Sequence, residues 1–405
     1  MRKEDNEMSY EVMVGNKATA VGCKLARIKV AAVFPITPQT TITEYLSEIH
    51  ASGELPGFEF INAEGELSSQ VIAQAAEATG ARSFTCTSGP GLLYMHHPMQ
   101  ETASKRLPLV MAVVHRGVKS MQPDHSDLMS QQWQGWLHIY VENAQEILDT
   151  TIMAYKIAED KRIRLPVAMG YDGYVLSYTA EPVEIPAQED VDKFLPPYKP
   201  MPGILPVSDS SDKWRDFEVN PKIFGAGWGE GDPMKPWQMH NEAVLNGETV
   251  IKEVFAEWGK KFGRTYGNGM IEPYRVEGAE CVITAMGTIA GTAMAAIDKL
   301  WADGKKVGLV KIRSFLPFPR NDFKEIAKNV GAIGVFDRSC QPGFYGPVYH
   351  QMRSTLYDEA KRTPILGFIG GLSGKEVRVE DMMKIGEKTL KVAKGGKPDA
   401  PIQWV

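Results

Sequence analysis

The chain has 405 residues, of which 43% are hydrophobic and 23% charged, and its formal net charge is −5. These proportions are typical of a globular protein with two or three domains, which can bury a core large enough to fold without disulfides or a structural metal. A negative net charge excludes the basic surface that nucleic acid or an anionic membrane would attract.

The four cysteines are far apart in the sequence and form neither a CxxC pair nor the closely spaced set that holds an iron–sulfur cluster. They are Cys23, Cys86, Cys281 and Cys340. We expect reduced thiols of a cytoplasmic protein, and any electron carriers must lie on another chain. The charged N-terminal residues lack the apolar region of a signal peptide, and no apolar run of about 18 residues predicts a membrane span.

Helical and strand-like patterns alternate between residues 12 and 172. Apolar, β-branched runs predict strands at 30–38, 58–62, 83–88, 107–115 and 165–172, and apolar periodicity predicts helices at 12–28, 40–50, 65–80, 91–103 and 143–160. Near-continuous apolar strands that alternate with helices indicate a doubly wound parallel sheet covered on both faces. Ligands of such sheets bind beyond the carboxyl ends of the strands, so the loops there are the candidate site.

The stretch 181–233 is rich in proline and shows little periodicity, and a helix is expected at 239–262. Alternation then resumes, with strands at 280–287, 306–315, 332–338 and 363–371 and helices at 291–304, 321–330 and 346–360. The sequence therefore predicts a first α/β domain at 1–180, a connector at 181–270 that contains no independent domain, and a smaller α/β domain at 271–405.

Two loops of the first domain carry polar side chains between structural elements. In Phe34–Thr41, prolines flank Thr37 and would hold its hydroxyl in a set direction, or the segment is only a turn in which Thr40 or Thr41 caps the next helix. In Asn62–Ser68, Glu64 and Glu66 precede a helix. They either favour its N-terminus electrostatically, or one of them exchanges a proton with a bound heterocycle.

Two further loops follow the next strands. Thr87–Gly91 carries glycines that let a ligand approach the main chain, although it is neither a GxGxxG motif nor a P-loop. Arg116 ends a strand and could clamp a carboxylate, or could pair with Asp124 or Asp127 to fix the loop. The histidines at 96 and 97 show no zinc-type spacing, and we expect no metal on this chain.

Taken together, these motifs resemble one family, the alpha subunits of pyruvate and related 2-oxoacid:ferredoxin oxidoreductases. The resemblance rests on FPITPQTTITEYL, NAEGELSS, GARSFTCTSGPGLLYMHHPM, DHSDLM with QGW, and VKIRSFLPFP. It implies a fold with a thiamine-diphosphate-binding domain of the pyrimidine type and a smaller domain like the C-terminal domain of transketolase. The chain has no GDG…N motif, which belongs to the diphosphate and Mg²⁺ half of the site on a beta subunit.

The resemblance also implies roles for individual residues. Glu66, with Glu64 as second choice, would hydrogen-bond the aminopyrimidine of thiamine diphosphate, and Thr37 and Arg116 would hold the oxo and carboxylate groups of a 2-oxoacid. The cofactor would lie against Glu66 and the loops after the strands, and the loop after Arg116 would close the substrate side. The cofactor-loop residues are Pro35, Ile36, Thr37, Ser88, Gly89 and Gly91, and the substrate-loop residues are Arg116, Asp124 and His125.

The implied activity is oxidative decarboxylation dependent on coenzyme A. CO₂ leaves, coenzyme A takes the acyl group, and electrons pass to [4Fe–4S] clusters on beta, gamma or delta subunits and then to ferredoxin or a similar acceptor. DHSD and QGW favour pyruvate over branched-chain or 2-oxoglutarate substrates. The loop after Arg116 is short and lacks a small apolar run, which leaves room for an aryl 2-oxoacid such as phenylglyoxylate.

Other classes stay open at this point. A non-oxidative thiamine enzyme, of the transketolase or decarboxylase type, would share the domain pattern but not FPITP together with DHSD. A structural subunit with vestigial loops would not keep Glu66, Thr37 and Arg116, and an NAD-dependent dehydrogenase would open its first helix with GxGxxG. The sequence does not indicate the particular oxoacid, the electron acceptor, the direction of flux or the subunit stoichiometry.

Overall fold

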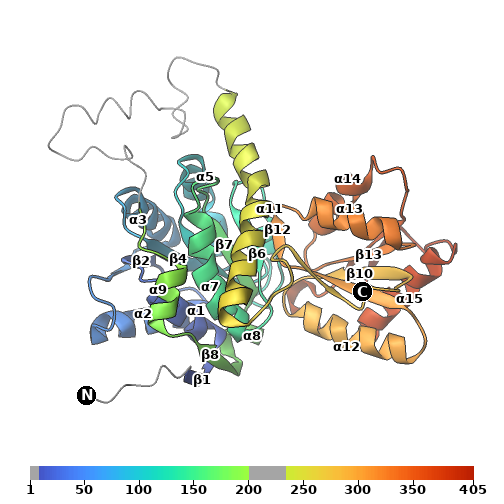
Figure 1. Cartoon of the computed structure of the whole chain (residues 1–405), viewed down its shortest axis with the longest axis horizontal. Coiled ribbons are helices and arrows are strands. Elements are labelled where there is room, and N and C mark those ends of the chain that lie inside the picture. The colour runs from blue at the N-terminus through green and yellow to red at the C-terminus, as the bar shows by residue number, and fades with distance from the viewer. Residues whose placement is uncertain (1–8, 200–233) are drawn as a thin grey trace.

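A computed structural model describes residues 9–199 and 234–405 and contains two large β-sheets flanked by helices, besides a two-stranded sheet (Figure 1). The first sheet contains, in spatial order, β12 (Ser314–Leu316), β6 (Leu137–Tyr140), β7 (Val167–Asp172), β5 (Val110–His115), β4 (Ser83–Thr87), β2 (Val30–Val33) and β3 (Glu59–Asn62). All its pairings are parallel except that of β12 with β6. The expected parallel sheet is confirmed.

Helices cover both faces of this sheet, as the buried strands require. One layer holds α1 (Gly15–Leu25), α2 (Thr40–Ser52), α7 (Ala144–Ala158) and the long α11 (Lys235–Phe262), which lies alongside α7 (Figure 1). The other holds α3 (Glu66–Ala78), α4 (Gly89–Tyr94) and α5 (His96–Ser104). In β5, Val110, Ala112 and Val114 face the first layer, whereas Met111 and Val113 face the second, because side chains alternate along a strand.

The second sheet contains, in spatial order, β15 (Ile402–Trp404), β14 (Ile365–Ile369), β13 (Ile333–Asp337), β10 (Cys281–Ala285), β11 (Val307–Ile312) and β9 (Ile271–Tyr274). Only β9 is antiparallel to its neighbour. On one face lie α12 (Ile289–Ala302) and α15 (Val379–Ala393), and on the other α13 (Arg320–Asn329) and α14 (Pro347–Leu356). A short 3₁₀ turn, η2 (Leu372–Gly374), follows β14.

Four sequence-based assignments need correction. The segment 12–28 is not one helix, because β1 (Ser9–Val14) pairs antiparallel with β8 (Ala180–Ile185) before α1 begins. The helix at 91–103 is interrupted at Met95 and forms α4 and α5. Strand β6 and helix α15 were not predicted, and the connector contains β8 and α9 (Gln188–Phe194). Residues 200–233 of the connector lie outside the described part of the chain.

The expected helix at 239–262 is confirmed as α11, and Val250, Val254 and Trp258 of its apolar face are buried. The proposed division at residue 271 stays a prediction, because β12 crosses to the first sheet and one apolar cluster continues across both halves. Trp136 and Tyr140 of the first half belong to that cluster together with Phe315 and Phe318 of the second.

Candidate active site

The candidate loops meet at one edge of the first sheet. In the spatial order β5, β4, β2 and β3, the strands are parallel, so their carboxyl ends lie side by side. The chain runs outward from β2 to β3 and then returns to place β4 on the other side of β2. Such a reversal of strand order opens a crevice for ligands at the ends of the two strands concerned. The loops after β2 and β4 border this crevice.

The loop after β2 is fixed by buried polar side chains. Asn16 of α1 donates to the carbonyl of Pro38 at 2.9 Å, and the side chain of Gln39 accepts from the Ile36 amide at 3.1 Å. Helix α2 begins at Thr40 without a side-chain cap hydrogen bond, so the threonines do not cap it. Thr37 is half-buried and Pro35 exposed. The loop is therefore a rigid support for the Thr37 backbone and side chain, as a functional loop requires.

Glu66 is the first residue of α3, and its carboxylate faces the helix that follows β4. A Cβ added to Gly91 would lie 2.7 Å from Oε1 of Glu66 and 2.6 Å from Oγ1 of Thr87. Only a glycine therefore allows α4 to come this close to the carboxylate. Glu64, in contrast, is exposed and accepts a hydrogen bond from Ser68, which lowers the pKa of Glu64. The structure thus brings Glu66, and not Glu64, to the loop after β4.

Arg116, at the end of β5, lies between the same loops. Its Nη1 donates to the carbonyl of Thr37 at 3.2 Å, and its aliphatic carbons lie against Gly89, where an added Cβ would be 3.2 Å away. Within residues 9–199 and 234–405, its guanidinium forms no salt bridge with Asp124 or Asp127, so the alternative of a loop-fixing ion pair is not observed. Instead the backbone N–H of Arg116 donates to Asp127 Oδ2 at 3.0 Å.

Asp124 and His125 turn toward the second half of the chain. Asp124 accepts hydrogen bonds from the amides of Ser126 at 3.0 Å and Ser373 at 2.9 Å. His125 donates its amide to the carbonyl of Arg338 at 2.9 Å, and burial lowers the pKa of its imidazole. Asp124 packs against Gly117, the neighbour of Arg116, but among the described residues neither side chain hydrogen-bonds to Glu66, Thr37 or Arg116. Sequence reasoning named Asp127 only as a possible ion-pair partner of Arg116, whereas it binds the Arg116 backbone N–H, and it missed Asn16, which holds the loop after β2.

Polar atoms of the site that lack a hydrogen-bond partner show which kind of ligand the site could hold. Oγ1 of Thr87, Oγ of Ser88 and Nε of Arg116 are buried and have no hydrogen-bond partner among the described residues. Buried polar groups normally have partners, and these three atoms are available to a polar ligand. The half-buried carboxylate of Glu66 and Oγ1 of Thr87 both lie against Gly91. The donor set fits a polar heterocycle bound between α3 and the loop after β4.

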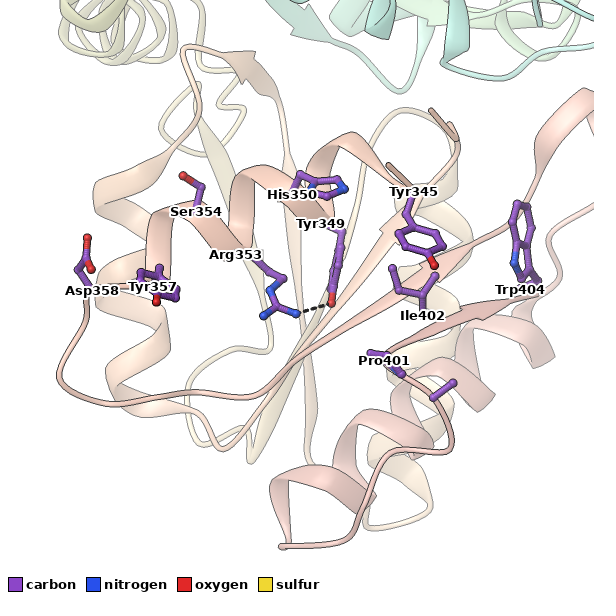
Figure 2. Close-up of a pocket in the computed structure, with 11 residues that line it drawn as sticks. Tyr345, Tyr349, His350, Arg353, Ser354, Tyr357, Asp358, Pro401, Ile402 and Trp404 are labelled. Carbon is purple, nitrogen blue, oxygen red and sulfur yellow. Dashed lines mark hydrogen bonds between the residues drawn. The ribbon is translucent and has the colours of Figure 1, made fainter. Parts of the chain in front are cut away.

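Two hollows lie elsewhere. A groove of about 680 Å³ separates the loops after β5 and α6 (Ser126–Met129) from residues 339–347 and Trp404. A pocket of about 890 Å³ lies between α14 and the C-terminal strand, and Figure 2 shows Arg353 donating to Tyr349 within it. Neither is lined by Glu66, Thr37 or Arg116.

Within the described ranges, no helix is long and apolar enough to cross a membrane, and no group of three His, Cys, Asp or Glu side chains is arranged to hold a metal ion.

Comparison with known proteins defines the class first. Residues 21–224 match the model for the thiamine-diphosphate-binding part of pyruvate flavodoxin/ferredoxin oxidoreductases, and residues 279–382 match core domain II of pyruvate:ferredoxin oxidoreductase. The fold and the matched regions thus define an α/β protein with a thiamine-diphosphate-binding domain. The chain belongs to the pyruvate flavodoxin/ferredoxin oxidoreductase family.

Several relatives align over almost their whole length. Pyruvate synthase subunit PorA of Pyrococcus abyssi is 39% identical and ketoisovalerate oxidoreductase subunit VorA of Pyrococcus horikoshii 39%, each with 97% of both chains covered. NADH-dependent phenylglyoxylate dehydrogenase subunit alpha of Aromatoleum evansii is 36% identical, with 96% of this chain and 93% of the relative covered. The family assignment makes this chain a subunit of an oxidoreductase that acts on a 2-oxoacid and works with partner subunits.

Solved structures agree on the fold. The 2-oxoglutarate:ferredoxin oxidoreductase from Magnetococcus marinus matches with a TM-score of 0.68 and 20% identity, over 95% of this chain and 66% of that chain. A split-gene transketolase matches with a TM-score of 0.53 and 14% identity, over 93% and 98%. The expected pyrimidine-type and transketolase-like architecture is confirmed at the level of fold, and the family excludes the non-oxidative alternative.

Proposed function

We propose that this chain supplies the pyrimidine-binding half of the thiamine diphosphate site in a 2-oxoacid:ferredoxin oxidoreductase, with pyruvate as the favoured substrate. The observation that carries the proposal is the close approach of Glu66 to Gly91, beside the unpartnered hydroxyls of Thr87 and Ser88. A half-buried carboxylate next to unsatisfied donors is suited to hold one edge of a polar heterocycle.

When bound, thiamine diphosphate supplies the nucleophilic carbon and the electron sink that removal of CO₂ from a 2-oxoacid requires. Glu66 would hydrogen-bond a ring nitrogen of the cofactor. Pro35 and Ile36 stiffen the loop, and Gly89 and Gly91 let the main chain approach. Arg116 and Thr37 bind the carboxylate and oxo groups of the substrate, since a guanidinium matches a carboxylate geometrically.

The partner that completes the site is proposed to be a beta subunit carrying the diphosphate and Mg²⁺ half. Leu67 and Val71 are exposed apolar residues four positions apart on α3, and Tyr94 is exposed at the end of α4. They lie on the same two helices as Glu66 and Gly91, and apolar residues around a site that is open on one side support a protein partner there. Gamma and delta subunits with [4Fe–4S] clusters, coenzyme A and ferredoxin follow from the same assignment.

An aryl 2-oxoacid is a second candidate substrate. The loop after Arg116 contacts the second half of the chain. There Ser120 donates to the Ser373 carbonyl at 3.5 Å, and Gln122 packs against Gly374. This short loop, held against the second half of the chain, is the feature that motivates the aryl alternative. A relative that is 36% identical is named a phenylglyoxylate dehydrogenase subunit, and one that is 39% identical a ketoisovalerate oxidoreductase subunit, so identity alone does not select the substrate.

The test is anaerobic purification of the native complex and an assay of viologen reduction with coenzyme A and a panel of 2-oxoacids. Highest kcat/KM with pyruvate supports the favoured substrate, whereas preference for phenylglyoxylate supports the aryl alternative. Absence of activity with every oxoacid, in a complex with bound thiamine diphosphate and intact clusters, would refute the proposed reaction.

A cytoplasmic location is also proposed, since all four cysteines are free and three of them are buried.

A further inference from the structure

The carboxylate of Asp127 joins the two loops of the candidate site. Its Oδ2 accepts the backbone N–H groups of Gly89 at 3.1 Å and Arg116 at 3.0 Å. Its Oδ1 accepts the backbone N–H of Leu128 at 2.7 Å and Nδ1 of His115 at 2.8 Å. The side chain is completely buried. Four donors therefore converge on one carboxylate, and two of them belong to segments that follow different strands of the sheet.

The two amides bound by Oδ2 belong to the segments that carry the proposed catalytic groups. Gly89 begins α4, whose Gly91 lies against Glu66, and the side chain of Arg116 contacts Gly89 and donates to Thr37. A shift of either amide would therefore change the distance between the Glu66 carboxylate and the guanidinium. These two side chains have to face the same bound molecule.

We propose that Asp127 is a positioning residue that sets the separation of the Glu66 side from the Arg116 side of the site. The inference rests on the proposed function, because it deepens the role of the same two loops. Asp127 touches neither cofactor nor substrate. It acts through the backbone of Gly89 and Arg116, whose N–H groups have no other hydrogen-bond acceptor among the described residues.

A second set of contacts supports the imidazole of His115, which hydrogen-bonds to Asp127. The imidazole of His115 stacks on Tyr140 with ring centroids 5.2 Å apart, and it lies 4.9 Å from the ring of His125. Nε2 of His125 lies 3.3 Å from Asp172, which Arg338 of the second half reaches at 2.9 Å. The position of the Asp127 carboxylate is therefore supported from both halves of the chain.

Replacement by asparagine keeps the shape and removes one acceptor. Whichever way the amide of Asp127→Asn is turned, its NH₂ faces at least one backbone N–H, either that of Leu128 or those of Gly89 and Arg116. Two donors repel each other, so one loop has to shift. A shift of about 1 Å at a reacting group can cost about 100-fold in rate, and we expect kcat/KM for the 2-oxoacid to fall at least about tenfold.

The experiment compares Asp127→Asn with Asp149→Asn in the assembled complex. Asp149 is a matched control, because it is also a fully buried carboxylate of the first sheet region and accepts hydrogen bonds from Arg264 at 2.6 Å and Tyr266 at 2.7 Å. Both substitutions should lower Tm. Only Asp127→Asn should lower kcat/KM, and its effect should shrink in an Arg116→Ala background, because alanine removes the guanidinium that a shifted backbone would misplace.

A kcat/KM within twofold of wild type, or a loss fully additive with Arg116→Ala, would overturn the proposal. Asp127→Ser is the second variant if asparagine prevents assembly, and failure of both to assemble would make Asp127 a folding residue only. A wild-type complex inactive with every 2-oxoacid would refute the proposed function instead. In that event thiamine diphosphate affinity is the readout, where a loss of at least about tenfold in Asp127→Asn supports positioning and an unchanged Kd overturns it.

Discussion

Substituting alanine for Gly91 should lower catalytic activity more than stability. The added Cβ would lie 2.7 Å from Oε1 and 2.9 Å from Cγ of Glu66, whereas ordinary contacts begin at 3.4 Å. Glu66 would have to withdraw by several tenths of an ångström to about 1 Å, which by the cost of misplacing a reacting group lowers kcat/KM about 10- to 100-fold, or about 1.4–2.7 kcal/mol. The same Cβ would lie 2.6 Å from Oγ1 of the buried Thr87, so a smaller loss of stability is expected as well, and the preference of alanine over glycine in a helix, about 1 kcal/mol, offsets part of it.

The assay measures kcat/KM, the affinity for thiamine diphosphate and Tm of the assembled Gly91→Ala complex. Gly291→Ala is the matched control, since Gly291 lies in α12 and an added Cβ there meets nothing within 4 Å. We expect the control to keep wild-type kinetics with an equal or higher Tm. A Gly91→Ala complex with kcat/KM within threefold of wild type would refute the reasoning that Glu66 works at this contact.

Three further outcomes are expected. Glu66→Gln should lower kcat by at least about 100-fold with assembly intact. Glu64→Gln, at an exposed site, should change kcat less than twofold. Equal effects of the two variants in kinetic assays would contradict the assignment of the cofactor-binding role to Glu66. Arg116→Ala should lower kcat/KM for any 2-oxoacid about 10- to 100-fold, and unchanged kinetics would exclude a carboxylate role. Burial raises the pKa of Glu77 to about 8, so the folded state keeps a proton that the unfolded state has lost. Its contribution to stability is therefore full below about pH 4 and is lost as the pH rises through about 8; Tm of Glu77→Gln should vary less over that range, and parallel pH profiles would refute this.

Much of the fold followed from apolar patterning, because both sheets are buried on two faces. Strands such as β5 are continuous apolar runs that need no alternation, and they were located correctly. The helix α15 could have been predicted as well, since Met382, Ile385 and Leu390 face the core at helical spacing. The strand β1 could not, because its pairing with β8 joins residues about 170 positions apart in the chain.

The sequence predicted which loops form the candidate site, but it did not predict how their side chains lie relative to one another. Glu64 and Glu66 are two residues apart, and only the approach of α4 at Gly91 distinguishes the carboxylate that faces the site from the one that faces solvent. The role of Asp127 depends on amides 38 and 11 residues away in sequence. No local pattern encodes such a contact, since the hydrogen-bond acceptor and its donors are brought together by the parallel pairing of β4 with β5.

The boundary between the two sheets is topological and does not separate two independent energetic units. Asp172, at the end of β7, is fully buried and receives Arg338 at 2.9 Å and the Thr288 amide at 3.1 Å, both from the second half. Without that half the carboxylate would lose its compensating charge, and β6 would lose its pairing with β12. The same interface supports His125 and, through His115, the carboxylate of Asp127. The arrangement of the candidate loops therefore depends on contacts from the second half of the chain.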